Sequence, residues 1–221
     1  MTARQAPAPD EVHLWRAEFD PLQGAPDWLT RALSADEREK TLRYREHADR
    51  ARFAWRRGWL RRLLADYLRF DPAELEFSRD ARGKPCLSRP EASWLRFNLS
   101  HSADVAVFAV ARGREVGVDV ELVRADFPFD DVARRVFPPD ERLAIEALPK
   151  EERVDTFFTM WTRKEAYLKG IGIGLSEEPV GDPDDWGLAS FDAGAGFAAA
   201  VAIEGADVRV PGLAQMLAAT A

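Results

Sequence analysis

The order of the predicted strands and helices constrains the fold of this chain more than any other feature of its sequence. Strand patterns, in which apolar and polar side chains alternate, cluster together and do not alternate one by one with helical patterns. Strands are expected at residues 12–19, 94–99, 105–111 and 116–123, with two or three more within 186–210. This clustering argues against a doubly wound parallel sheet and predicts a mixed α+β fold.

Helical patterns fill the stretches between the strand clusters. Ser34 and Glu37 have the spacing of a capping box, which predicts a helix start and a helix over residues 35–45. Further helices are expected at residues 50–69, 138–148 and 152–169, and glycines at positions 170, 172 and 174 end the last and strongest of them. Each half of the chain thus has helices followed by strands. We therefore predict an N-terminal α+β unit over residues 1–112 and a C-terminal one over residues 113–221.

Composition excludes several classes of protein. The 221 residues are 46% hydrophobic, which is enough for a substantial core. A net charge of −7 argues against non-specific nucleic-acid binding as the main function, because attraction to phosphate needs a positive face. A single cysteine, Cys86, excludes an intrachain disulfide and a cysteine-rich metal cluster.

The sequence also indicates where the protein works. Residues 1–10 lack the basic-then-apolar pattern of a signal peptide. No apolar run approaches the ~18 residues that suggest a membrane span. We expect a cytoplasmic protein that acts neither on nucleic acid nor in a membrane.

Two acidic residues share one face of a predicted strand in the segment Gly-Val-Asp-Val-Glu at residues 117–121. Because alternate residues of a strand point the same way, Asp119 and Glu121 lie on one side and the valines on the other. Two carboxylates this close repel each other unless a cation lies between them, and hard oxygen ligands suit magnesium. The alternative is a half-exposed strand with two solvated acids, and spacing alone leaves both open.

A third acid lies on the strongest predicted helix. Steps of four residues place Trp161, Glu165 and Lys169 along one helical stripe. Glu165 and Lys169 could form a surface ion pair, or they could supply a third carboxylate for a metal and a lysine for a phosphate. The glycines that follow do not form a phosphate loop, because such loops precede a helix, where N–H groups point outward.

Three further segments could hold an anion. Residues 98–102, Asn-Leu-Ser-His-Ser, place Ser100 and His101 on an expected loop, where they could hold a phosphate. A Ser-His hydrolase is the rival interpretation, but the chain has no Gly-x-Ser-x-Gly motif. Gly83-Lys84-Pro85 is a turn that fixes a lysine, and residues 38–62 hold ten of the 31 Lys and Arg residues. Such clustering in an acidic protein suits an anionic ligand.

These segments, in this order, resemble the 4'-phosphopantetheinyl transferase superfamily, in the long, monomeric class that activates peptide and polyketide synthases. The matching segments are residues 83–85, 98–102, 117–121 and 161–175, the last reading W-T-R-K-E-A-Y-L-K-G-I-G-I-G-L. The resemblance extends from about residue 34 to residue 175. One position departs from it: near the start of the first helix a basic residue is expected, and this chain has Glu37 with Arg38 beside it.

The resemblance implies two similar α+β halves packed with pseudo-two-fold symmetry, with the active site in the cleft between them. It implies that Asp119, Glu121 and Glu165 coordinate Mg²⁺ together with the pyrophosphate of coenzyme A. Lys169 would neutralise the departing phosphate. The coenzyme A contacts that it implies are Lys40, Arg52, Lys84, Pro85, Ser100, His101 and Lys169.

The activity that the resemblance implies is transfer of the 4'-phosphopantetheine arm of coenzyme A to a serine hydroxyl of an apo-carrier protein, releasing 3',5'-adenosine bisphosphate. Its catalytic residues would be Glu165, Lys169 and Asp119, with Glu165 as the first choice of general base. We expect a monomer, because two halves in one chain make a complete cleft. Two alternatives stay open: a coenzyme A or nucleotide-binding module without transfer activity, and a protein-interaction domain whose charged residues only cover its surface.

Overall fold

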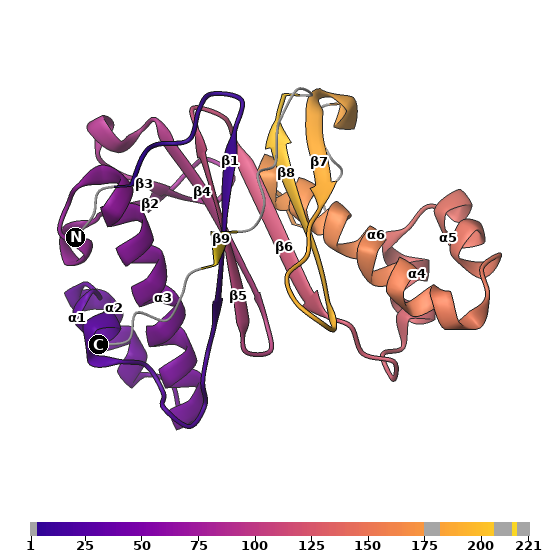
Figure 1. The fold of residues 1–221 in the computed structure, drawn as a ribbon, viewed down its shortest axis with the longest axis horizontal. Coiled ribbons are helices and arrows are strands. Elements are labelled where there is room, and N and C mark those ends of the chain that lie inside the picture. Colours follow the sequence, from indigo (N-terminus) through magenta and orange to yellow (C-terminus); the bar gives the residue numbers. More distant parts are fainter. Residues whose placement is uncertain (1–3, 175–181, 206–213, 216–221) are drawn as a thin grey trace.

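Two largely antiparallel sheets meet at the middle of the molecule in the computed structural model, which describes residues 4–174, 182–205 and 214–215 (Figure 1). The strands of the N-terminal sheet lie in the order β4-β5-β1-β9, with the bounds β1 Val12–Glu18, β4 Leu95–Ser102, β5 Val105–Arg112 and β9 Ala214–Gln215. The short strand β9 pairs with β1 in parallel. The C-terminal sheet has the order β6-β8-β7, with the bounds β6 Val116–Leu122, β7 Trp186–Ser190 and β8 Phe197–Glu204.

Helices cover the outer side of each sheet. The N-terminal half carries α1 Asp27–Arg31, α2 Ala35–Leu42 and α3 His47–Leu68, followed by a small hairpin of β2 Phe77–Arg79 and β3 Pro85–Leu87. The C-terminal half carries α4 Phe129–Val136, α5 Pro139–Glu146 and α6 Lys150–Ile171. None of the described helices combines the length and the apolar character needed to cross a membrane.

The two halves repeat one topology. In each, a first strand leads into three helices, of which the third has 22 residues, and two further strands of the same sheet follow, in the N-terminal half after the separate β2–β3 hairpin. The third strand of each set lies between the first and the second: β5 between β1 and β4, and β8 between β6 and β7. This order confirms the expectation of two similar α+β halves.

The ends of the predicted elements differ from the observed ones by a few residues, with one difference that matters. The sequence predicted that Ser100 and His101 lie on a loop. This prediction is wrong, because strand β4 extends to Ser102 and contains both residues. The second half of β4 is rich in polar residues, which are more typical of a loop than of a strand, and this hid the true end of the strand. Residues 206–210 of the expected C-terminal strands lie outside the described part.

Short elements escaped prediction. Helix α1 has five residues, the strands of the β2–β3 hairpin have three each, and α4 begins after Pro128 with no side-chain cap. The capping box of α2 is confirmed, with Ser34 and Glu37 bonded reciprocally across the first turn.

Separate apolar clusters hold the parts together. Helix α3 packs on the N-terminal sheet through large side chains such as Trp55, Trp59 and Leu64. Smaller valines and alanines of both sheets, among them Val107 and Val118, fill the space between the halves. Burial of these side chains stabilises the contact between the halves by roughly 25 cal/mol per Å² of apolar surface.

Helix α6 lies directly against β6 at Gly117 (Figure 1). A Cβ atom at position 117 would overlap the Ala166 carbonyl oxygen and would come within 2.8 Å of the Gly170 Cα. Because both neighbours are backbone, the helix could not yield by turning a side chain. The missing side chain of Gly117 therefore sets the distance between α6 and β6.

Replacing Gly117 by alanine is expected to lower the free energy of unfolding by about 3 kcal/mol, since the added methyl group would overpack this contact. Chemical denaturation would measure the change. Gly24→Ala is the control: it adds the same methyl group where no atom lies within 4 Å, at a φ of +70°, and should cost only about 1 kcal/mol of backbone strain. Equal losses in the two variants would contradict the close packing of α6 on β6.

Candidate functional site

Strands β4 and β6 belong to different sheets but are joined by side chains. Alternate residues of β4, namely Asn98, Ser100 and Ser102, project toward β6 because a strand turns every second side chain to one face. The Val118 N–H donates to the Asn98 Oδ1 at 3.0 Å, and the Leu122 N–H donates to the Ser102 Oγ at 3.0 Å. These bonds tie β6 to the polar face of β4.

The same face of β4 orients both acids of β6. The Ser100 hydroxyl donates to the Asp119 Oδ1 at 2.8 Å, and the Ser102 hydroxyl donates to the Glu121 Oε2 at 2.7 Å. Asp119 and Glu121 thus lie on one face, as the alternation predicted. Each carboxylate is held by a neutral hydroxyl group.

Asp119 is a buried carboxylate, only 2% exposed. Lys169 of α6 donates from its Nζ to the Asp119 Oδ1 at 2.6 Å and to the Ser100 Oγ at 2.9 Å. Burial raises the pKa of Asp119, and the Lys169 ammonium and the Ser100 hydroxyl oppose this rise. The other oxygen, Oδ2, is buried and has no hydrogen-bond partner among the described residues.

One pocket gathers most of the candidate residues. Its lining comes from β4, β6 and α6, and comprises Leu99, Ser100, His101, Asp119, Glu121, Trp161, Glu165 and Lys169. Both halves of the chain contribute to it, as the resemblance implied. Helix α6 crosses β6 and brings Glu165 and Lys169 over the two acids of the strand, so the stripe predicted along α6 faces the pocket.

Three carboxylates in one pocket interact electrostatically. Burial raises the pKa of Glu165, and the charges of Asp119 and Glu121 raise it further, while Lys169 lowers it. Burial also raises the pKa of Glu121, and the Ser102 hydroxyl opposes this rise. Lys169 alone does not offset the accumulated negative charge, so the pocket favours an additional cation.

These residues fit the magnesium ion that the family implies. The unpartnered Asp119 Oδ2 and the carboxylates of Glu121 and Glu165 are hard oxygen donors. Within the described ranges, no three His, Cys, Asp or Glu side chains converge tightly enough to enclose a metal ion. Magnesium in proteins typically takes one or two carboxylates and completes its coordination with substrate phosphates and water.

Arg52 and Arg56 of α3 lie near the end of β4, beside the pocket, and are called the positive rim. His101 is exposed near the end of β4, and desolvation of its ring, together with the nearby cations Arg56 and Lys169, lowers the pKa of His101 to about 4. The Arg52 guanidinium pairs with Asp104, in the turn after β4, with Nη2 at 3.0 Å from Oδ1. Arg56 was not singled out from the sequence, although its position four residues after Arg52 places both on one side of α3.

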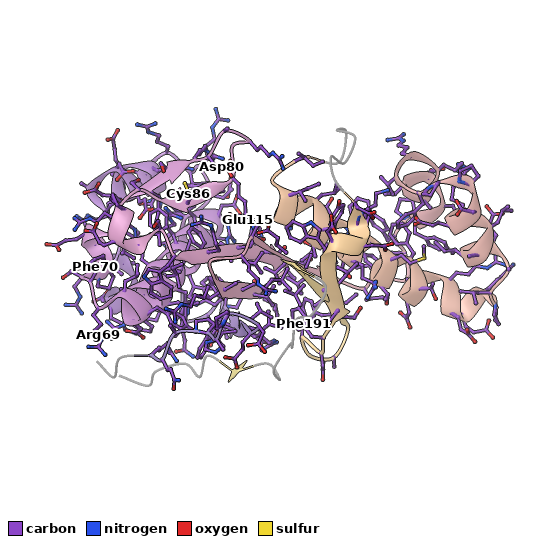
Figure 2. The ribbon with its side chains drawn as sticks, turned by 90° about the horizontal axis from the view of Figure 1, so that it is seen from above. Arg69, Phe70, Asp80, Cys86, Glu115 and Phe191 are labelled. Atoms are coloured by element: carbon purple, nitrogen blue, oxygen red, sulfur yellow. The ribbon has the colours of Figure 1, made fainter. Side chains whose placement is uncertain are left out.

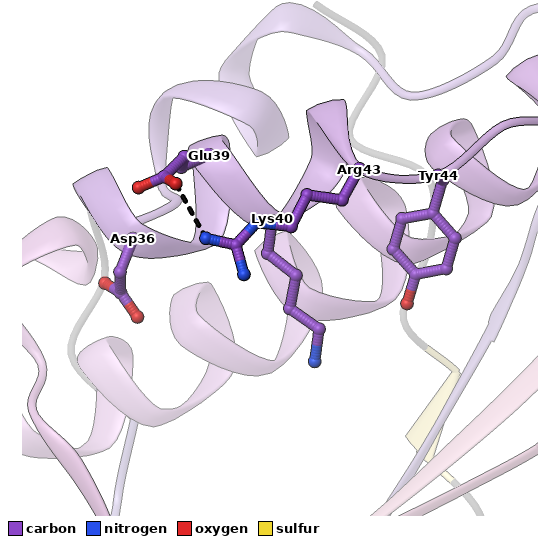
Figure 3. Close-up of a pocket in the computed structure, with 5 residues that line it drawn as sticks. All are labelled: Asp36, Glu39, Lys40, Arg43 and Tyr44. Carbon is purple, nitrogen blue, oxygen red and sulfur yellow. Dashed lines mark hydrogen bonds and ion pairs between the residues drawn. The ribbon is translucent and has the colours of Figure 1, made fainter.

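Lys40 lies in a different pocket, formed along α2 (Figure 3). Figure 3 shows Arg43 turned toward Glu39, with Nη2 at 2.7 Å from Oε1, while Lys40 extends beside Tyr44. The Lys40 ammonium lies 5.1 Å from the centre of the Phe53 ring. The structure thus places Lys40 outside the pocket of the three acids.

Lys84 and Pro85 also lie apart from that pocket. Lys84 is buried at the junction of the two halves and bonds to Glu115 and to α6, as described further below. Pro85 is exposed and begins β3.

The acid at position 37 has a structural explanation. Glu37 is buried and pairs with Arg57 and Arg61 of α3. Arg61 in turn donates to the carbonyl oxygens of Pro72 and Leu75. Glu37 therefore ties α2 to α3 and does not face the pocket.

Comparison with known proteins supports one family over both halves of the chain. Residues 115–207 match the sequence profile of the 4'-phosphopantetheinyl transferase superfamily, and residues 17–113 match the profile described as 4'-phosphopantetheinyl transferase, N-terminal. Together the two profiles account for the topology that repeats in the two halves.

Individual relatives agree with the profiles. The chain is 40% identical over 169 residues to the 4'-phosphopantetheinyl transferase HetI of Nostoc sp., which is 76% of this chain and 71% of that protein. It is 35% identical to a phosphopantetheinyl transferase of Thraustochytrium sp., over 76% of this chain and 63% of the relative. It is 30% identical to the 4'-phosphopantetheinyl transferase Sfp of Bacillus subtilis, over 65% of this chain and 62% of the relative. The alignments thus span less than two thirds of the last two relatives.

The shared profiles and the extent of identity agree with the arrangement of acids, lysine and serine at the junction of the two halves, and this chain belongs to the 4'-phosphopantetheinyl transferase superfamily.

Proposed function

We propose that this protein transfers the 4'-phosphopantetheine arm of coenzyme A to a serine hydroxyl of an apo-carrier protein, with magnesium, and releases 3',5'-adenosine bisphosphate. The observation that carries the proposal is the gathering of Asp119, Glu121, Glu165 and Lys169 around one pocket at the junction of the halves. A phosphoryl transfer of this kind depends mainly on positioning and on neutralising negative charge. The pocket offers both.

The carboxylates would hold the metal and Glu165 would also handle the proton. Asp119, Glu121 and Glu165 are the proposed ligands of Mg²⁺, which when bound supplies positive charge to the pyrophosphate. The carrier serine attacks the phosphorus nearer the pantetheine arm, and the bond from that phosphorus to the bridging oxygen breaks. Glu165 is the proposed base that takes the serine proton, directly or through water.

Lys169 is proposed to neutralise the departing phosphate. Its Nζ donates to the Asp119 Oδ1 and to the Ser100 Oγ, so two oxygens hold the ammonium in the lining of the pocket. An incoming phosphate would meet a cation already oriented. Asp119 is counted as catalytic because it positions this ammonium as well as the metal.

The nucleotide end of coenzyme A is proposed to lie along the positive rim. Ser100 and His101 line the pocket, and Arg52 lies beside the turn that follows β4. The resemblance also implies that Lys40 assists from α2 and that the turn with Lys84 and Pro85 lies by the adenine, although the Lys84 ammonium itself is bonded to Glu115 and to the end of α6. For these last three, the family resemblance is the main support.

The wider assignments are also proposals. The two proposed structural units are residues 1–112 and 113–221, with β5 ending at Arg112 and β6 beginning at Val116, and the short strand β9 of the second unit pairs with β1 of the first. We propose a cytoplasmic monomer of the class that serves secondary-metabolite synthases, whose partners are coenzyme A and carrier-protein domains. A coenzyme A-binding module without transfer activity is the weaker alternative, because binding alone would not require three acids beside a lysine.

Mass spectrometry of intact carrier proteins tests the activity. Several diverse apo-carriers are incubated with the enzyme, coenzyme A and Mg²⁺, with a chelator in a parallel series. We expect each accepted carrier to gain the mass of one phosphopantetheine arm, and the chelator to abolish the gain. The absence of any gain on all carriers would refute transfer, and calorimetry with coenzyme A would then test the binding-module alternative.

Glu165→Gln is expected to lower the rate of transfer about 10²–10⁴-fold, because it removes the proposed base and one metal ligand. The fold and part of the coenzyme A affinity should persist, since glutamine has the same size. Glu151→Gln is the matched control, because Glu151 is exposed in the first turn of the same helix. Near-normal turnover of Glu165→Gln would remove Glu165 from the mechanism.

Asp119→Asn tests whether Asp119 binds the metal. The amide oxygen can still accept hydrogen bonds from Ser100 and Lys169, while the buried negative charge is lost. We expect the free energy of unfolding to fall by about 1–3 kcal/mol, because the amide NH2 group would take the place of the buried Oδ2, which has no hydrogen-bond partner among the described residues. The magnesium-dependent increase in coenzyme A affinity should disappear, as calorimetry with and without Mg²⁺ would show. An unchanged increase would exclude Asp119 as a ligand.

A further inference from the structure

Two cations of the β2–β3 turn reach across to the C-terminal end of α6. The Arg82 Nη1 donates to the Ile171 carbonyl oxygen at 2.6 Å, and the Lys84 Nζ donates to the Gly170 carbonyl oxygen at 2.8 Å. The turn belongs to the N-terminal half and the helix to the C-terminal half. Figure 2 labels Glu115 at the junction of the halves, beside the hairpin that carries Asp80 and Cys86.

The end of a helix is a suitable target for these cations. The last carbonyl groups of a helix have no partner within it, and the helix dipole places partial negative charge there. Helix α6 ends at Ile171 and is capped by Gly172, which has a left-handed φ of +78° and lies next to the Cβ atoms of Arg82 and Lys84. A side chain on Gly172 would meet the Arg82 Cβ at 3.3 Å, so the helix end and the turn are in close contact.

Lys84 is committed to this junction by its surroundings. It is only 8% exposed, and its Nζ also donates to the Glu115 Oε2 at 2.6 Å. Glu115 lies between the two halves and pairs through its other oxygen with Arg96 at 2.7 Å. Burial lowers the pKa of Lys84, and Glu115 opposes that change. A buried ammonium with these two acceptors is held in place and is not directed into the pocket.

The bond between Lys84 and Gly170 is next in the chain to Lys169, which lines the pocket of the three acids. Gly170 follows Lys169, whose ammonium lies on Asp119 and Ser100, and Glu165 lies little more than one turn earlier on the same helix. A shift of the helix end by a fraction of an ångström would move Lys169 relative to Asp119. Positioning errors of about 1 Å can cost on the order of 10²-fold in rate.

We infer that Arg82 and Lys84 are positioning residues that fix the C-terminal end of α6, and with it Lys169 and Glu165, against the acids of β6. The expected effect of these residues on transfer rests on the proposed function. Their hydrogen bonds to the end of α6 do not depend on that proposal. The positioning role differs from a contact with adenine, because the two side chains would act through the helix and not on the nucleotide.

Hydrogen exchange and kinetics of three variants test the inference. Lys84→Met and Arg82→Gln each remove one bond to the end of α6, and Arg82→Gln changes an exposed residue, so this variant should fold even if Lys84→Met does not. Arg89→Met is the matched control, because Arg89 belongs to the same half but pairs with the exposed Glu76 at 3.5 Å. Amide exchange at residues 168–173 is compared with exchange in α3.

We expect exchange at residues 168–173 to become at least about tenfold faster in both test variants, with α3 unchanged, and neither region to change in Arg89→Met. The kcat of transfer should fall about tenfold, whereas affinity for adenosine 3',5'-bisphosphate should change less than twofold. Unchanged exchange, or faster exchange with normal kcat, would overturn the inference. Weaker bisphosphate binding with unchanged exchange would instead make Lys84 a direct ligand contact.

The two proposals fail in different ways. If the parent protein transfers nothing to any carrier, the proposed function is refuted, and the exchange measurement still decides whether the turn holds the end of α6. If transfer is normal in the parent and exchange does not respond to the substitutions, only the positioning role is overturned.

Discussion

The close approach of α6 to β6 is the constraint on which the rest of the site depends. Gly117 has no side chain, so the backbone of the helix at Ala166 and Gly170 rests directly on the strand. At this distance a lysine of the helix can reach a buried carboxylate of the strand. A larger residue at position 117 would push apart the elements that carry the acids and the lysine.

The second constraint is the polar face of β4. Strands of one sheet pair through backbone hydrogen bonds, whereas β4 and β6 belong to different sheets and are joined by the side chains of Asn98, Ser100 and Ser102. Side chains can bond to backbone N–H groups and to carboxylates at once, so the contact that joins the halves also orients the acids. Stability and function are thus built from the same hydrogen bonds.

The three carboxylates of the site repel one another because they lie close together and are partly buried, and this repulsion is unfavourable for stability. Lys169 and two serine hydroxyls offset part of the cost, while one oxygen of Asp119 stays without a partner among the described residues. An arrangement that favours an added cation and an anionic substrate together is less stable when both are absent. Protein stability and activity commonly conflict in this way at functional sites.

The sequence by itself determined the class of fold, the long helices and the position of Asp119 and Glu121 on one face of a strand. These features follow from the periodicity of each segment alone. Its motifs, taken in order, also identified the family. Only the tertiary structure decided that Glu165 and Lys169 face those acids, that Ser100 and Ser102 lie in a strand and hold carboxylates, and that Lys84 caps a helix of the other half. These partners are tens of residues apart in the chain, and no local pattern records which distant backbone a side chain will meet.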